Sequence, residues 1–298
     1  MYTLAVKSRV MPRVGPVLAR PLKAQSLAVG EEDEVLTFLA KRPILTVIMA
    51  GLIRDNGLGS PLNRGSFHAC RDATGRLEGV ALIGHVTMVE TESEAALECF
   101  AHVAQKHQLA HVILGEEDKI KRFWDFYCPG GQSPRLMCRE ILFEKRSPTE
   151  VHEPVTLRRA TLADIEMVVP VHAQMCFDEC GINPMDRDPV GFRQRVACRI
   201  ERGRIWVWTE AGKLIFKADV QSDTPEQAYL EGVYTTPEQR GKGYGFRCIS
   251  QLSRTLLANT KSLCVLSNEQ NRAAQLFYRK AGYKMRGYYD TIYLQVEN

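Results

Sequence analysis

The segment Leu230–Gly245 reads LEGVYTTPEQRGKGYG and determines the fold that we expect for this chain. It begins with strand-forming residues, passes through Pro237 into a glycine-rich turn, and continues into an amphipathic helix pattern that starts near Phe246. Glycines allow the backbone to approach an anion without a Cβ in the way, and the free N–H groups of a first helical turn point at it. The segment therefore predicts a binding site for the pyrophosphate of a ligand.

Three kinds of phosphate-binding loop compete for this segment. An ATP-binding P-loop requires G-x-x-x-x-G-K-[ST], and a dinucleotide loop requires G-x-G-x-x-G with an acidic residue about 20 positions later. Neither spacing is present, and residues 261–266 contain no carboxylate. The third kind, [QR]-x-x-G-x-[GA], grips the pyrophosphate of coenzyme A and is matched by Arg240, Gly243 and Gly245.

A second pattern lies downstream of the loop. Residues 262–267 (SLCVLS) look like a short buried strand, and residues 271–283 then read NRAAQLFYRKAGY. This stretch resembles the N-x-x-A-x-x-x-Y-x-K-x-G-[FY] helix of the GCN5-related N-acetyltransferases, the GNAT superfamily. The two motifs occur in the family's order and at about its separation. The resemblance implies an α/β fold with a mixed sheet, and a GNAT fold in the C-terminal half.

The resemblance can be narrowed to a subgroup. The segments 175–184 (MCFDECGINP), 216–220 (FKADV) and 231–234 (EGVY) are similar to a bacterial group of GNAT proteins. Members of that group carry an N-terminal domain of unknown function in front of the GNAT domain. This similarity implies a fold and a cofactor but not a substrate.

The chain divides into two halves with a similar order of predicted helices and strands. A length of 298 residues suggests two domains, and the polar segment 146–154 suits a linker between residues 1–148 and 149–298. In the first half the patterns predict helices at 32–40, 45–53, 93–106 and 116–127, and strands at 66–71, 77–85, 84–89, 110–114 and 135–143. We therefore predict a tandem arrangement with a degenerate GNAT-like first domain; a coincidental α/β pattern is the alternative. Its segment 90–95 (ETESEA) replaces the glycine loop with three carboxylates, which predicts lost cofactor binding.

Composition limits the partners and the compartment. The net charge of +4 arises in the first thirty residues, which hold five basic and no acidic residues, so a nucleic-acid partner is not expected. The longest apolar run, residues 44–53, is too short for a membrane span. Strand-like residues at 2–6 and 16–29 favour an ordered start over a transit peptide. Nine cysteines without metal or disulfide spacings indicate free thiols, a cytoplasmic location and no metal cofactor.

The resemblance also implies how acetyl-CoA is held. The backbone of Val233, Tyr234 and Thr235 would pair with the pantetheine arm like an added strand. An N–H group of that strand would polarise the acetyl carbonyl. The pyrophosphate would be bound by the amides of Arg240, Gly241, Lys242, Gly243, Tyr244 and Gly245, and Asn271 would touch the cofactor near the next helix.

Two residues are candidates for proton transfer. Tyr278 matches the family tyrosine that protonates the departing sulfur, and a core tyrosine packed against the cofactor is the alternative. Glu231 is our candidate base, on the same side of its strand as Tyr229 and Val233. The commonest family position for a basic glutamate falls on Tyr229, so a structural or surface role for Glu231 stays open.

The remaining polar residues are assigned by position. We expect Asp178, Glu179 and Lys217 to face the acceptor groove or to stabilise its helix, and His172 to be a packed core histidine. The sequence thus predicts an acetyl-CoA-dependent N-acetyltransferase that acts on a small amine, amino acid or peptide by direct transfer in a ternary complex. A non-catalytic acyl-CoA-sensing module and an enzyme for a longer acyl chain are the alternatives.

Overall fold

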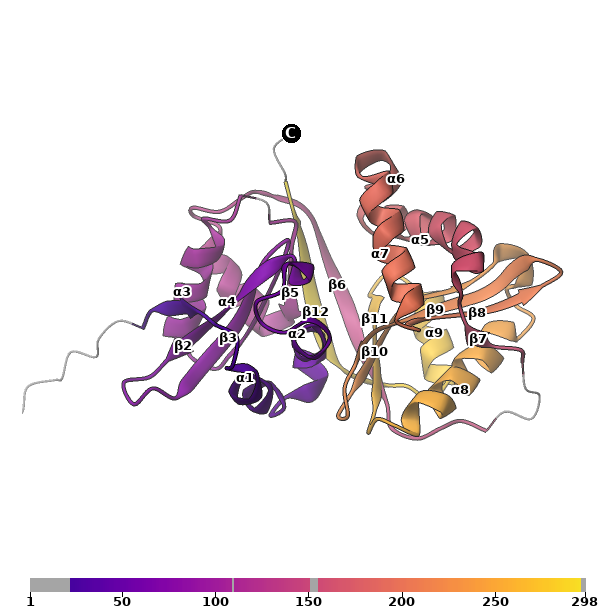
Figure 1. Ribbon diagram of the computed structural model, residues 1–298, viewed down its shortest axis with the longest axis horizontal. Helices are drawn as coiled ribbons and strands as arrows, with labels where there is room; N and C mark the ends of the chain where they lie inside the picture. Colours follow the sequence, from indigo (N-terminus) through magenta and orange to yellow (C-terminus); the bar gives the residue numbers. More distant parts are fainter. Residues whose placement is uncertain (1–21, 109, 151–154, 296–298) are drawn as a thin grey trace, which may run out of the picture.

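Two lobes, one from each half of the chain, flank a pair of long strands in the computed structural model (Figure 1). The structure describes residues 22–108, 110–150 and 155–295. The predicted strand-like segment 2–6, the first part of the segment 16–29 and residues 151–154 of the predicted linker lie outside the described residues. No helix in the described part of the chain is long and apolar enough to cross a membrane.

The first half is an α/β lobe with helices on both faces of its strands. In chain order it contains β1 (Ala24–Ser26), α1 (Glu32–Leu39), α2 (Pro43–Asn56), the 3-10 helix η1 (Pro61–Asn63), β2 (Gly65–Arg71), β3 (Leu77–Gly84), β4 (Val86–Thr91), α3 (Glu94–Ala104), β5 (Val112–Glu116), α4 (Glu117–Tyr127) and β6 (Pro134–Lys145). One apolar core forms under α3 and α4, and another forms under α1 and α2.

The second half repeats this order and adds one short helix. It contains β7 (Arg158–Arg159), the 3-10 helix η2 (Leu162–Asp164), α5 (Ile165–Cys180), α6 (Pro184–Arg187), α7 (Pro189–Glu201), β8 (Ile205–Glu210), β9 (Lys213–Asp223), β10 (Ala228–Thr235), η3 (Pro237–Gln239), α8 (Tyr244–Leu257), β11 (Leu263–Asn268), α9 (Arg272–Lys280) and β12 (Lys284–Leu294). The predicted mixed α/β class is confirmed, and both halves run β-α-α-β-β-β-α-β-α-β apart from α6.

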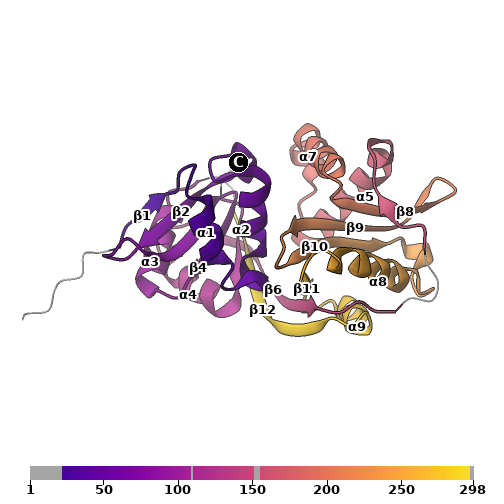
Figure 2. The same ribbon diagram turned by 60° about the horizontal axis from the view of Figure 1, so that its bottom comes forward.

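The two lobes exchange their last strands. The sheet runs β1-β2-β3-β4-β5-β12-β6-β11-β10-β9-β8-β7, so the final strand of each half lies inside the sheet of the other. Residues 289–293 of β12 pair with β5, and residues 140–145 of β6 pair with β11. The two exchanged strands also pair with each other along their length, side by side in both views (Figures 1 and 2).

Helix α2 of the first half connects the lobes a second time. Gly51 on α2 lies so close to β9 that an added Cβ would be 2.6 Å from the side chain of Ser222. At the end of α2, Asp55 Oδ1 accepts a hydrogen bond from Arg204 Nη2 at 2.8 Å. The first half is therefore packed against the second half's sheet, and it forms one wall of the space in front of that sheet.

The strand exchange predicts how the chain can be cut. A fragment of residues 131–298 keeps β6, whereas a fragment of residues 146–298 lacks it and leaves β11 and β12 without the strand that joins them. We expect a cooperative thermal transition by circular dichroism only for the longer fragment, because the shorter one exposes unpaired backbone groups. Equal transitions in the two fragments would contradict a structural need for β6 in the second lobe.

Candidate functional site

Strand β10 separates from its neighbour β11 halfway along its length. The two parallel strands pair only from Ala228 to Leu230, opposite residues 263–265 of β11. From Glu231 to Thr235 the edge of β10 that faces β11 carries no strand partner, although its other edge still pairs with β9. Ser267 of β11, beyond the part that pairs with β10, has a buried hydroxyl without a hydrogen-bond partner among the described residues. The opening thus offers unused hydrogen-bonding groups on both of its sides.

A bulge at Gly232 bends β10 at this opening. The register of β10 against β9 shifts between Glu231 and Tyr234, and Gly232 has a positive φ of 58°. Beneath the bulge, Lys217 is fully buried, with its Nζ 2.7 Å from Asp219 Oδ1 and 3.3 Å from the carbonyl oxygen of Gly232. A Cβ at Gly232 would be 2.8 Å from the Lys217 ammonium, so a side chain here would crowd the ion pair in a left-handed conformation that favours glycine.

The structure differs from two expectations drawn from the sequence, for Lys217 and for Val233. Lys217 lies under the strand as part of a buried ion pair and does not line the groove where the acceptor was expected. Tyr229 and Glu231 do share one face, but Val233 packs with the core on the opposite face because the extra residue reverses the alternation.

The loop after β10 presents a row of free backbone donors. Gly241 and Gly243 have φ values of 76° and 82°, and a Cβ built on either would meet open space. The first backbone bond of helix α8 runs from Arg247 N to Gly243 O at 3.1 Å. Within the described residues, the N–H groups from Gly241 to Phe246 donate to no acceptor. The Arg240 N–H, which was also expected to bind the pyrophosphate, donates instead to Pro237 O at 3.2 Å. Unpaired amides at the start of a helix are a typical arrangement for binding an anion.

The side chains around the loop keep it open. Arg240 lies over the ring of Tyr234 and donates from Nε to Thr235 O at 3.0 Å, and Lys242 Nζ donates to Gln239 Oε1 at 3.0 Å. Gly245 allows α8 to approach β10, because an added Cβ would be 2.8 Å from Thr235 Oγ1. Two cations and the amide row suit a pyrophosphate, so the residues present fit coenzyme A at this place.

Tyr278 lies on α9 behind the opening. Asn271 caps this helix, since its Oδ1 accepts from Ala274 N at 3.0 Å. The Tyr278 ring is 7% exposed and packs against the rings of Phe143, Phe277 and Tyr283. Burial, and then the nearby Tyr283, raise the pKa of Tyr278 above its ordinary value. The phenol is therefore neutral at physiological pH and can donate a proton.

The matching place in the first half is filled. Strands β4 and β5 pair only at two positions and then diverge. Five charged side chains occupy the opening: Arg42, Glu90, Glu92, Glu116 and Lys119. Buried Lys119 donates to Glu90 Oε2 at 2.8 Å, and helix α3 starts at Glu94 without a glycine loop. Ion pairs thus occupy the opening that stays free in the second half.

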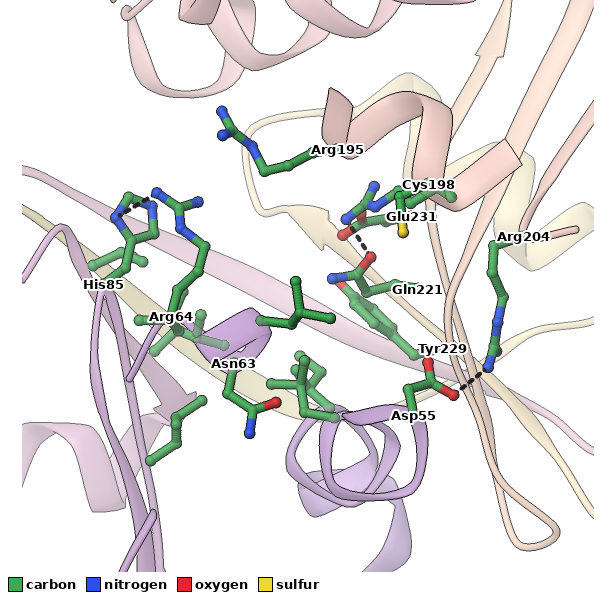
Figure 3. Close-up of a pocket in the computed structure, with 18 of the residues that line it drawn as sticks. Asp55, Asn63, Arg64, His85, Arg195, Cys198, Arg204, Gln221, Tyr229 and Glu231 are labelled. Atoms are coloured by element: carbon green, nitrogen blue, oxygen red, sulfur yellow. Dashed lines mark hydrogen bonds and ion pairs between the residues drawn. The ribbon is translucent and has the colours of Figure 1, made fainter. Parts of the chain in front are cut away.

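A cavity of about 720 Å³ lies between the lobes, on the face of the second sheet opposite to α8 (Figure 3). Its walls come from α2, η1 and β4 of the first half and from α5, α7, β9 and β10 of the second. Tyr229 and Glu231 line it just before β10 bends away from β11. The cavity therefore reaches the strand opening from the side opposite to the amide row.

Carboxyl groups gather on one side of this cavity. Glu231 Oε1 accepts from Arg199 Nη1 at 2.8 Å, and the same guanidinium also bonds Gln221. Enclosure by the cavity walls, and then the nearby Glu140 and Glu231, raise the pKa of Glu179 to about 7. Glu179 has no hydrogen-bond partner among the described residues, so its carboxyl is free to meet a ligand.

Of the other predicted polar residues, Asp178 lies outside the cavity and His172 is part of its lining. Asp178 accepts from Gln174 Nε2 at 2.7 Å on the exposed side of α5 and does not line the cavity. His172 is enclosed, with Nδ1 3.4 Å from Asp219 Oδ2, and burial followed by Lys217 lowers its pKa to about 3. No group of three possible ligands among the described residues could hold a metal ion.

Arg199 is the main residue that the sequence did not single out. It lies on α7, where Arg195 and Arg202 share its side of the helix at a spacing of three or four residues. The signal in the sequence is a row of arginines at helical spacing beside a row of apolar residues, which predicts a basic face on this helix.

Residues 201–285 match the sequence model of the family described as the acetyltransferase (GNAT) domain. The second half of the chain contains a GNAT domain. Solved GNAT structures resemble the whole chain: one from Sphaerobacter thermophilus has a TM-score of 0.59 at 13% identity, over 95% of this chain and 98% of that one. One from Colwellia psychrerythraea has a TM-score of 0.56 at 13% identity, over 92% of this chain and all of that one.

A third similar structure is a tandem GNAT protein from the clavulanic acid biosynthesis pathway. Its TM-score is 0.55 at 12% identity, with 93% of this chain and all of that one covered. At such identities the likeness concerns the fold, and it agrees with the paired order of elements described above. No curated protein matches the chain. The predicted GNAT fold and tandem arrangement are confirmed.

The ion pair under the bulge predicts a large loss of stability. Replacing Lys217 with methionine removes one partner of a fully buried pair and leaves the Asp219 charge without it. We expect the free energy of unfolding to fall by about 3–5 kcal/mol in urea titrations. Lys213→Met, at an exposed position of the same strand, is the control and should change it little. Equal effects of the two substitutions would contradict the buried pair.

The raised pKa of Glu179 predicts a pH-dependent gain in stability. The ordinary pKa of 4.5 applies to the unfolded chain and about 7 to the folded one, so the unfolded chain loses this proton first. The resulting loss of stability builds up between pH 4.5 and 7 and is complete above pH 7. We expect Glu179→Gln to raise the melting temperature at pH 8 and to change it little at pH 4. Glu201→Gln, on α7 outside the cavity, should show no such difference. A pH-independent effect of Glu179→Gln would refute the raised pKa.

Proposed function

We propose that the second half transfers an acetyl group from acetyl-CoA to the primary amine of a small molecule, amino acid or peptide. The observation that carries this proposal is the row of unpaired amides at Gly241–Phe246 beside the unpaired edge of β10. Six unpaired N–H groups suit a pyrophosphate, and the unpaired edge of the strand just before them suits an arm that contains amides. Coenzyme A has both.

Acetyl-CoA would supply the activated acyl carbon when bound. The amides from Gly241 to Phe246 would hold the pyrophosphate, with charge from Arg240 and Lys242. The free edge of β10 at Val233–Thr235 would pair with the pantetheine arm. An N–H group near the bulge would then point at the acyl oxygen and stabilise the charge that develops there.

The two-sided opening supports direct transfer in a ternary complex. The amide row starts helix α8, which packs on one face of the second sheet, whereas the cavity lies on the other face. Donor and acceptor can therefore enter from opposite faces and meet at the gap between β10 and β11. No covalent relay through the protein is required by this arrangement.

Proton transfer is assigned to Glu179 and Tyr278. A carboxyl with a pKa of about 7 and no hydrogen-bond partner is suited to accept the proton of the attacking ammonium. Glu231, already bonded by Arg199, would orient the amine. As the new C–N bond forms and the C–S bond breaks, the neutral Tyr278 phenol would protonate the departing thiolate.

The compartment is part of the proposal. All nine cysteines are free thiols, which supports a reducing compartment such as the cytoplasm.

Tyr278→Phe tests the catalytic reading of this site. The substitution removes only the hydroxyl, so we expect kcat to fall by about a hundredfold or more while acetyl-CoA affinity by calorimetry stays unchanged. Tyr288→Phe, on β12, serves as the control. Acetyl-CoA binding without turnover of any amine would favour the sensing module, and no binding by the full chain would refute both.

A further inference from the structure

The cavity between the lobes is charged in opposite ways at its two sides. Figure 3 shows Arg64 and Arg195 reaching toward each other from opposite lobes, whereas Tyr229, Gln221 and Glu231 lie on the other side. The cavity volume of about 720 Å³ is that of a small-molecule site. The charged side chains that line the cavity therefore indicate which charges a small-molecule ligand would carry.

Arg64 anchors the basic side from the first half. It ends the 3-10 helix η1 with a left-handed φ of 52°, which turns its side chain into the cavity. Its Nη2 lies 3.1 Å from His85 Nδ1, and among the described residues Arg64 forms no ion pair with a carboxylate. Burial, and then the charge of Arg64, lower the pKa of His85 to about 3, so His85 is a neutral acceptor.

Arg195 of the second half and Arg135 of β6, in the first half, add positive charge to the same side. Arg195 on α7 is close enough to Arg64 to repel its charge. Arg195 Nη1 lies 2.9 Å from Oδ2 of the exposed Asp188, and this carboxylate also attracts the charge of Arg64. Arg135 lies over the ring of Tyr293, which also lines the cavity, and its charge reaches the nearby His111. Guanidinium groups thus outnumber carboxylates here, which favours an anion.

The other side of the cavity is acidic. Glu140, Glu179 and Glu231 come from three different elements and repel one another through the cavity. Arg199 is hydrogen-bonded to Glu231, and Glu140 accepts only from Thr291 among the described residues. One cation among three carboxyl groups leaves room for the positive charge of an ammonium group.

We propose that the acceptor is a primary amine that also carries an anionic group, a carboxylate or a phosphate. This inference rests on the proposed acetyl transfer, because it places the ammonium beside Glu179 and Glu231 and the anionic group between Arg64 and Arg195. The ammonium side borders the strand opening, where the thioester would arrive. The first half therefore supplies an acceptor-binding arginine, even though its own strand opening is filled by ion pairs.

Matched acceptors test the charge requirement. The full-length protein with acetyl-CoA is assayed with each of the common amino acids and the amine left by its decarboxylation, and with O-phosphoethanolamine and ethanolamine. We expect kcat/KM to be at least about tenfold higher for the anionic member of the preferred pair. The amino acids and the phosphate ester distinguish a carboxylate from a phosphate.

Arginine variants test the site. Arg64→Gln and Arg195→Gln should each raise KM for the anionic acceptor by about 10- to 100-fold, with little change in kcat or in KM for acetyl-CoA. KM for the neutral amine should stay unchanged. Arg193→Gln, on α7 but paired with Glu166 outside the cavity, and Arg76→Gln, on the surface of the first half, are the matched controls.

The outcomes separate this inference from the proposed function. Turnover that prefers neutral amines, or that ignores both arginine variants, overturns the inference and leaves acetyl transfer standing. If no amine is turned over, calorimetry with the same amino acids and O-phosphoethanolamine decides. Binding that Arg64→Gln weakens supports the anionic site while the proposed function fails; absence of binding by every anionic amine overturns the inference.

Discussion

The pairing of β6 with β12 is the constraint on which the rest of the structure depends. Each of these strands ends one half of the chain and completes the sheet of the other half. Neither lobe has a full set of strand partners without its neighbour, so the two lobes hold a fixed relation to each other. That relation creates the cavity, because one wall comes from α2, η1 and β4 and the other from α5 and α7.

The two halves share a fold but differ at the opening between their diverging strands, which is filled in the first half and free in the second. In the first half, Lys119 and Arg42 bridge the carboxylates of Glu90 and Glu116, so charge pairs close the opening, and the pair of Lys119 with Glu90 is buried. In the second half, the buried pair of Lys217 with Asp219 lies below the strand, and Lys217 also donates to the carbonyl oxygen of Gly232 in the bulge. In the first half, ion pairs fill the strand opening. In the second half, the ion pair lies under the strand, and the opening itself stays free.

Local sequence was sufficient for the fold class and for the conformation of the glycine-rich loop. The glycines at 241 and 243 predicted a turn with unhindered amides, and the apolar alternation predicted the strands on either side, since both are short-range properties of the backbone. The strand exchange could not be predicted, because β12 carries the same alternation whether it pairs inside its own half or in the other. The position of Val233 was also missed, because one extra residue in β10 reverses the alternation of its side chains. Lys217, on β9, was expected at the groove, but its ammonium is buried against Asp219 and the carbonyl oxygen of Gly232.

The acceptor side depended on contacts between residues far apart in the chain. Arg64 and Arg195 approach each other only because η1 and α7 belong to lobes joined through β6 and β12. Glu140, on β6, reaches the second half's site only through the same exchange. The element that joins the lobes therefore also contributes to the acidic side of the cavity. This arrangement gives the degenerate first half a physical reason to be retained: in the proposed enzyme it would build the acceptor site rather than a second cofactor site.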